Sequence, residues 1–176
     1  IRSVQSTQQI TKAMEMVAAA KLRKAQARAE AARPYARSME RVLTNLSAAA
    51  RSLAHPLFEV REARRVLVAV IASDKGLCGA FNTNVFRRAE EHLAAIGRAD
   101  VLLVPVGKRA CSYFGRRRWD MGRAVPRLGD RVDLGLVRSL GRSAVELFTS
   151  GAVDRVDFVS TRFITTATRR VEVTSL

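Results

Sequence analysis

The longest uninterrupted feature of the sequence is a glycine-free stretch that precedes Gly76. Within it, residues 2–54 are rich in Ala, Arg, Lys, Glu, Met and Leu, which are strong helix formers. This composition predicts one helix over residues 2–54. At a rise of ~1.5 Å per residue, such a helix is ~80 Å long. Because that length exceeds the width of a domain built from 176 residues, the helix must project from the rest of the fold.

Apolar residues recur along this helix at alternating steps of three and four, which is the spacing of a coiled-coil seam. The seam consists of Leu22, Ala25, Ala29, Ala32, Ala36, Met39, Leu43, Leu46, Ala50 and Leu53. Before Leu22 the apolar stripe shifts to Ile10, Met14 and Val17, which indicates a local change of heptad phase. The other substantial predicted helix, residues 133–150, is too short to pair with the seam. We therefore expect the partner to be another chain or a segment absent from this sequence.

Pro34 lies within the seam pattern. Proline removes one backbone hydrogen bond and kinks or divides a helix. The seam keeps its phase across Pro34, which favours one kinked helix. Two helices joined near Arg33 are the alternative.

From residue 66 the pattern changes to short apolar runs separated by helical stretches, which is typical of a largely parallel sheet covered by helices. The expected strands are residues 66–72, 101–106, 155–165 and 170–175, and the expected helices are 82–96, 108–114 and 133–150. We expect Asn82 to cap the first of these helices. The predicted fold class is α/β: a long N-terminal coiled-coil helix, residues 1–56, followed by a Rossmann-like, mostly parallel sheet domain with flanking helices, residues 64–176.

The formal net charge is +15, and the basic residues are spread over both halves of the chain. Such a surface favours an acidic partner, which includes nucleic acid, an anionic membrane and acidic protein. Cys78 and Cys111 lack metal-ligand spacing and are expected to be free thiols in a reducing compartment. No stretch reaches the ~18 apolar residues of a membrane span.

Three segments carry residues that could support chemistry. The loop SDKGLCGA follows a strand and opens a helix, but it matches neither phosphate-binding glycine motif, so a tight turn is favoured over a nucleotide site. Cys78 lies in this loop, and a catalytic thiol there needs His55 or His92 as a base, neither of which has an obvious orienting carboxylate. The third segment, Arg116–Trp119, combines charge with one aromatic ring, and a solvated basic loop is favoured over a nucleic-acid site.

Four segments resemble the gamma subunit of F-type ATP synthases. They are TQQITKAMEMVAAAKLRKAQ (Thr7 to Gln26), ARPYA (Ala32 to Ala36), HP (His55–Pro56) and SDKGLCGAFN (Ser73 to Asn82). The last includes the family's loop signature, formed by Ser73, Asp74, Gly76, Leu77, Cys78 and Gly79. The resemblance implies a central rotor shaft that couples rotation of the membrane ring to conformational change at the catalytic beta subunits. It also implies that the chain has no active site of its own.

The implied partners are the alpha, beta and epsilon subunits and the membrane c-ring, with no nucleic acid. ATP, ADP and Mg act on the beta subunits, so this chain is expected to bind no cofactor or metal. The implied location is peripheral, at the cytoplasmic face of a bacterial plasma membrane, with membrane association only through the complex. The resemblance places the acidic levers of beta against Lys12, Met14, Val17, Lys21 and Arg23.

Compared with the family pattern, residues before Ile1 and the C-terminal helix after Leu176 are expected to be missing. Two other functions remain open at this stage. A nucleic-acid-binding protein would use the basic helix, and a small α/β enzyme would use the glycine loop and Cys78.

Overall fold

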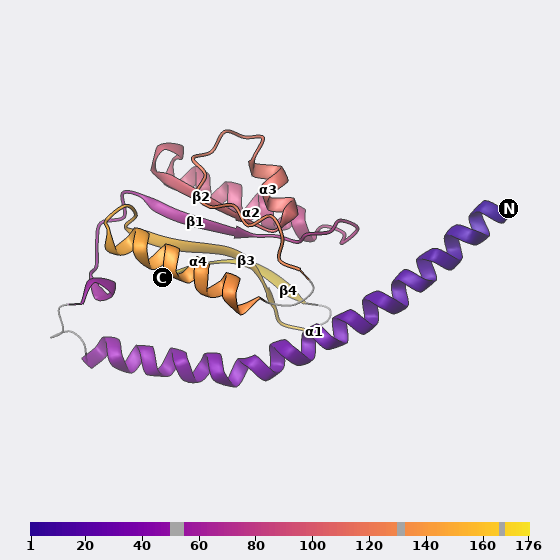
Figure 1. The fold of residues 1–176 in the computed structure, drawn as a ribbon, viewed down its shortest axis with the longest axis horizontal. Coiled ribbons are helices and arrows are strands. Elements are labelled where there is room, and N and C mark those ends of the chain that lie inside the picture. The colour runs from indigo at the N-terminus through magenta and orange to yellow at the C-terminus, as the bar shows by residue number, and fades with distance from the viewer. Residues whose placement is uncertain (50–54, 130–132, 166–167) are drawn as a thin grey trace. The chain divides into compact units, whose positions relative to one another are not determined.

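The computed structural model describes residues 1–49, 55–129, 133–165 and 168–176. The chain divides into two compact units, residues 1–54 and 55–176. In the described part of the chain, the long helix belongs to the first unit and the strands belong to the second (Figure 1).

Helix α1 runs from Arg2 to Ala49 as one continuous helix of 48 residues (Figure 1). Pro34 lies inside it, so the single-helix interpretation is confirmed and the division near Arg33 is not observed. Hydroxyl groups of Thr7 and Thr11 donate to the carbonyls four residues earlier, at 2.9 and 2.8 Å. The helix therefore forms as its composition predicts, and the proline is accommodated within it.

The second unit alternates strands and helices in the predicted order. Its elements are η2 (Pro56–Phe58), β1 (Val66–Ile71), α2 (Phe81–Ile96), η3 (Arg98–Asp100), β2 (Val101–Val106), α3 (Lys108–Phe114), α4 (Leu134–Thr149), β3 (Arg155–Phe163) and β4 (Arg169–Ser175). Predicted and observed strand boundaries agree to within two residues. The α/β fold class is confirmed.

The four strands form one sheet in the order β2-β1-β3-β4. Strand β1 pairs in parallel with β2 and β3, while β4 runs antiparallel to β3. The sheet is therefore mostly parallel, and its central strand β1 has partners on both sides. The register places Val68 opposite both Leu103 and Asp157.

Alternate residues of the strands feed two separate hydrophobic clusters, one on each face of the sheet. Val66, Val68 and Val70 pack with residues of α2 and α3. Leu67 and Ala69 lie on the opposite face, where residues of α4 cover them. Figure 1 shows the same layering, with α2 and α3 on one side of the sheet and α4 on the other.

The expectation that Asn82 caps α2 is wrong. The helix begins one residue earlier, at Phe81, and Ala80 occupies the N-cap position without a side-chain hydrogen bond. The Asn82 side chain instead accepts the backbone N–H of Ser73 at 3.1 Å. A cap is a local contact, whereas this contact depends on how the loop after β1 folds back.

The sequence of residues 115–132 predicts a polar, glycine-rich connection, of which residues 130–132 lie outside the described residues, and part of the described segment extends the sheet edge. Met121 and Val125 form parallel bridges with Leu103 and Val106 of β2. Val125 is buried in the cluster beneath α4. The sequence pattern does not predict this pairing because Met121 and Val125 are single residues outside any apolar run of strand length.

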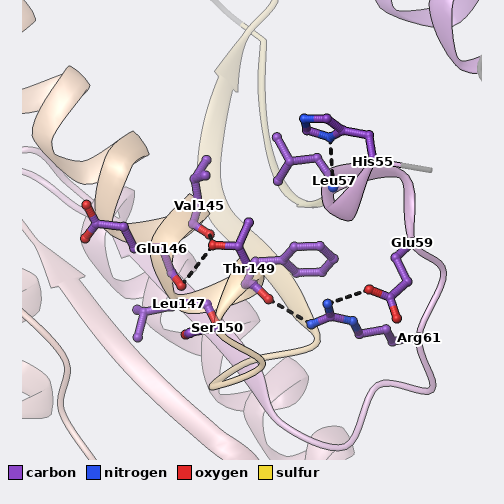
Figure 2. A network of polar contacts seen from close by, with 10 residues as sticks. His55, Leu57, Glu59, Arg61, Val145, Glu146, Leu147, Thr149 and Ser150 are labelled. Carbon is purple, nitrogen blue, oxygen red and sulfur yellow. Dashed lines mark hydrogen bonds and ion pairs between the residues drawn. The ribbon is translucent and has the colours of Figure 1, made fainter. Parts of the chain in front are cut away.

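The segment before β1 is attached to the C-terminal end of α4 (Figure 2). Arg61 donates to the carbonyl of Phe148 at 2.8 Å and forms an ion pair with Glu59 at 2.6 Å. The same guanidinium lies 4.7 Å from the centre of the Phe148 ring. Two contacts with Phe148 thus fix Arg61, and with it the start of the α/β unit, to the end of α4, and the ion pair with Glu59 orients the guanidinium.

Candidate functional site

The seam of α1 is exposed to solvent wherever its side chains are described. Its apolar residues do not contribute to either hydrophobic cluster, and Leu43, for example, is 56 % exposed. Ala50 and Leu53 lie outside the described residues. An exposed apolar stripe of this length and spacing indicates a surface that another helix covers. The seam itself remains a prediction, since the partner helix is not part of the structure.

The five residues assigned to the beta levers lie along two sides of α1. Met14, Val17 and Lys21 follow steps of three and four and therefore share one side. Lys12 and Arg23 lie roughly opposite them on a helix of ~3.6 residues per turn. Met14 and Val17 are 52 % and 57 % exposed, and Lys12 pairs with Glu15 at 3.7 Å. One flat partner surface would therefore contact only one of these two groups.

The loop signature after β1 is organised around Asp74. Its carboxylate accepts the backbone N–H groups of Lys108 at 3.1 Å and of Leu128 and Gly129 at 2.9 Å each. Burial favours the neutral acid, but these donors and nearby Arg127 outweigh it and hold the pKa of Asp74 below its ordinary value. Asp74 therefore joins three segments that are distant in the sequence.

The remaining residues of the signature form the turn itself. Gly79 has a φ of 57°, which glycine adopts without strain, and Leu77 has the same φ with a side chain that is 96 % exposed. Gly76 packs against Arg109, where a Cβ would collide with the guanidinium. Ser73 donates its backbone N–H to Asn82. These contacts agree with the tight-turn interpretation of the loop.

Cys78 is exposed in this loop, and its Sγ lies 3.1 Å from the Asn82 Nδ2. Cys111 is half-buried, and burial raises the pKa of its thiol. Both cysteines are free, as the sequence analysis predicted. Neither thiol therefore forms a disulfide.

The statement that His92 lacks an orienting carboxylate is wrong. Its Nε2 lies 2.7 Å from Oδ2 of Asp157, which is fully buried on β3. Arg155 contacts the same carboxylate at 3.0 Å. Burial favours the neutral acid, but the hydrogen bonds from Arg155, Ser175 and His92 outweigh it and keep the pKa of Asp157 below its ordinary value. His92 thus bonds this carboxylate through Nε2, whereas the Cys78 thiol contacts the side chain of Asn82.

The basic segment Arg116–Trp119 folds back onto aromatic side chains of the core. The guanidinium of Arg117 lies 3.5 Å from the centre of the Tyr113 ring and pairs with Glu90 at 3.4 Å. Arg98 lies 4.8 Å from the centre of the Trp119 ring, which packs against the cluster beneath α2 and α3. The tryptophan is therefore a packed side chain, and not an open platform for a base.

Across residues 1–49, 55–129, 133–165 and 168–176, no three His, Cys, Asp or Glu side chains gather in a manner suited to a metal ion. Within the same ranges no helix is both long and apolar enough to cross a membrane. The described residues instead form a long helix with an exposed apolar seam and a compact α/β unit. This arrangement is typical of proteins in which a projecting helix pairs with another helix.

A family model described as ATP synthase matches residues 1–176, which is the whole chain. The chain is 44 % identical over 174 residues to the ATP synthase gamma chain of Heliobacterium modesticaldum, and 41 % identical over 170 residues to that of Desulforamulus reducens. It therefore belongs to the gamma family of ATP synthases.

Each of these two alignments covers 97 % of this chain. They cover 58 % and 59 % of the relatives, so the chain spans about three fifths of the length of the curated relatives it matches. Among solved structures, a chain of the Tetrahymena thermophila mitochondrial ATP synthase central stalk and c-ring matches with a TM-score of 0.75 and 26 % identity. That match covers 95 % of this chain and 71 % of the other.

Proposed function

We propose that this chain forms part of the central rotor shaft of an F-type ATP synthase. In this role α1 contributes the shaft, and the α/β unit contributes its foot. Rotation of a membrane ring would turn the shaft and change the conformation of the catalytic beta subunits. The chain would have no active site of its own.

The observation that carries the proposal is the exposed seam of α1. A seam that extends over so many heptads needs a partner helix of similar length, and a rotor shaft built from two helices supplies one. The similarity to gamma chains over nearly the whole sequence, and to a central-stalk structure, supports the same role.

The proposed partners are the alpha and beta subunits around the shaft, with the epsilon subunit and the c-ring at its foot. ATP, ADP and Mg would bind the partner subunits. The chain would be peripheral, at the cytoplasmic face of a bacterial plasma membrane, and its curated relatives are bacterial. The whole chain has a formal net charge of +15. The basic side chains of the shaft helix would face acidic segments of beta.

Nucleic-acid binding is not favoured over this role. The match to the ATP synthase family extends over the whole chain, including the basic helix. Arg117, which belongs to the segment that suggested a nucleic-acid site, is stacked on the Tyr113 ring, and the Trp119 ring of the same segment is covered by Arg98.

The test uses a chimera in which these 176 residues replace the aligned region of the Heliobacterium modesticaldum gamma chain. The chimera is mixed with that organism's alpha and beta subunits and passed over a sizing column in high salt. We expect co-elution that survives salt, together with a rise in ATP hydrolysis. Failure to co-elute, combined with tight and salt-sensitive binding to DNA, would overturn the proposal.

A matched pair of variants tests the seam. Leu43 lies in the seam, and Asn45 is exposed on the opposite side of the helix, about 160° away. Burial of a leucine contributes about 1.5–3 kcal/mol, so Leu43→Asp should weaken assembly at least about tenfold. Asn45→Asp should leave assembly nearly unchanged. Equal losses in both variants would show that the seam is not a specific contact surface.

A further inference from the structure

A cavity of about 320 Å³ lies between α4 and the face of the sheet that α4 covers. Its floor is formed by residues of β1, β2 and β3, and its roof by α4. The side chains that line it are almost all apolar and include Leu67, Val104, Leu140, Ala144, Leu147 and Phe158. This volume falls near the lower end of the range for small-molecule sites, about 300–1,000 Å³.

The cavity exists because α4 does not fill the space above the sheet. None of the residues of α4, from Leu134 to Thr149, is fully buried. A Cβ built on Gly141 would meet nothing within 4 Å, although this residue lines the cavity. On the opposite face, by contrast, α2 and α3 contribute Val85, Ala89, Leu93 and Phe114, all fully buried. The under-packing is therefore specific to the α4 side.

An empty apolar cavity of this size is costly, because its lining loses dispersion contacts and water gains no hydrogen bonds inside it. An apolar molecule of matching size would restore those contacts. The lining thus selects for a hydrocarbon group.

One charged side chain at the edge of the cavity indicates the chemical class of the ligand more closely. Among the described residues that line it, Arg123 carries the only charge. Arg123 lies between the two bridges that Met121 and Val125 make with β2, so the sheet edge fixes its backbone. Its Nη1 donates to Ser139 Oγ of α4 at 2.8 Å, which holds the guanidinium beside the cavity while the side chain stays exposed.

We propose that this cavity binds a medium-chain carboxylate. The hydrocarbon tail would occupy the space between α4 and the sheet, and the carboxylate would pair with Arg123 at the exposed edge. A planar guanidinium donates two parallel hydrogen bonds to a carboxylate, which an alcohol cannot accept in the same way. This inference does not depend on the shaft role, since the cavity belongs entirely to the α/β unit.

The test is a calorimetric titration of the full chain with octanoate and with 1-octanol, which share a hydrocarbon tail. We expect one octanoate per chain and weaker binding of octanol. Arg123→Gln should weaken octanoate binding about tenfold, since one charge-assisted contact of this kind is worth a factor of that order. It should leave octanol binding unchanged. Arg138→Gln is the matched control, because Arg138 is an exposed cation on α4 that does not line the cavity.

A second variant tests whether the hydrocarbon tail binds in this cavity. Ala144 lines the cavity, so Ala144→Phe should fill it and abolish binding of both molecules. If this variant does not fold, methyl NMR of the unmodified chain decides instead. Octanoate should then shift the methyl signals of Leu67, Leu140 and Leu147, and leave Leu103 on the opposite face unchanged.

Three outcomes would overturn the proposal. The first is the absence of saturable octanoate binding. The second is an Arg123→Gln variant that binds octanoate as well as the unmodified chain. The third is equal shifts of methyl signals on both faces of the sheet, which would indicate non-specific adsorption of the hydrocarbon.

Discussion

Two aspartates hold together segments of the α/β unit that are far apart in the sequence. Asp74 binds backbone amides of α3 and of residues 128–129. Asp157 lies at the centre of the contacts with His92 and Arg155. Both carboxylates have a lowered pKa, which means that the folded state stabilises their charged forms.

Asp74→Ala should destabilise the chain by about 2 kcal/mol, because three backbone donors lose a charged acceptor. The measurement is urea unfolding followed by circular dichroism. Glu62→Ala is the control, since it removes only an exposed ion pair with Arg64 and should cost under about 1 kcal/mol. Equal effects in the two variants would contradict the joining role of Asp74.

Asp157→Asn should destabilise the chain by about 3 kcal/mol at pH 7, because it leaves Arg155 without its buried partner. A lowered folded-state pKa means that the unfolded chain binds more protons near the ordinary carboxyl pKa of about 3.9. The stabilisation by Asp157 is therefore fully present above that pH, and is lost as pH falls through the lower folded-state pKa.

The check on Asp157 is to compare unfolding of the variant and the unmodified chain at pH 7 and at successive steps below pH 4. The stability difference between them should shrink as the pH falls. Asp120→Asn, which alters an exposed ion pair with Arg65, serves as the control and should show little change. A difference for Asp157→Asn that stays constant over this range would contradict the assigned charge state.

At the scale of elements, α1 and β1 show two different ways of stabilising regular structure. Helix α1 has exposed side chains throughout its described length, apart from the partly exposed Gln26, and so depends on local helix propensity. Strand β1 is buried over five of its six residues and has partners on both sides. Its stability therefore comes from packing.

Pro34→Ala should stabilise the middle of α1 locally by about 3 kcal/mol, the cost of a proline within a helix. Helical signal by far-ultraviolet circular dichroism should rise, and amide exchange in residues 30–38 should slow. Ala31→Gly should act in the opposite direction by about 1 kcal/mol. Unchanged exchange after Pro34→Ala would mean that the proline imposes no local cost on α1.

At the scale of the whole molecule, the two units should differ widely in stability. Amides of β1 should open only in global unfolding of the α/β unit, whereas those of α1 should open by local fraying in a monomer. Hydrogen exchange followed by mass spectrometry measures both in one experiment. Uniform protection across residues 22–49 in a proven monomer would contradict the expectation that the seam needs a partner helix.

The sequence alone predicted the features that depend on local pattern. Helix propensity and heptad spacing predicted α1, and its continuation through Pro34 followed from the unbroken phase of the seam. Short apolar runs predicted strands such as β2, whose bounds Val101–Val106 agree with the expectation. Each of these signals arises from neighbouring residues, so no knowledge of the tertiary fold was needed.

Only the tertiary structure decided which side chains meet across the fold. The contact of Asn82 with Ser73, the burial of Asp157 beside His92, and the cavity beneath α4 all join residues from separate elements. Their positions depend on strand order and on how closely a helix packs on the sheet. Local periodicity contains no information on either, because it records which face a residue occupies and not what lies opposite that face.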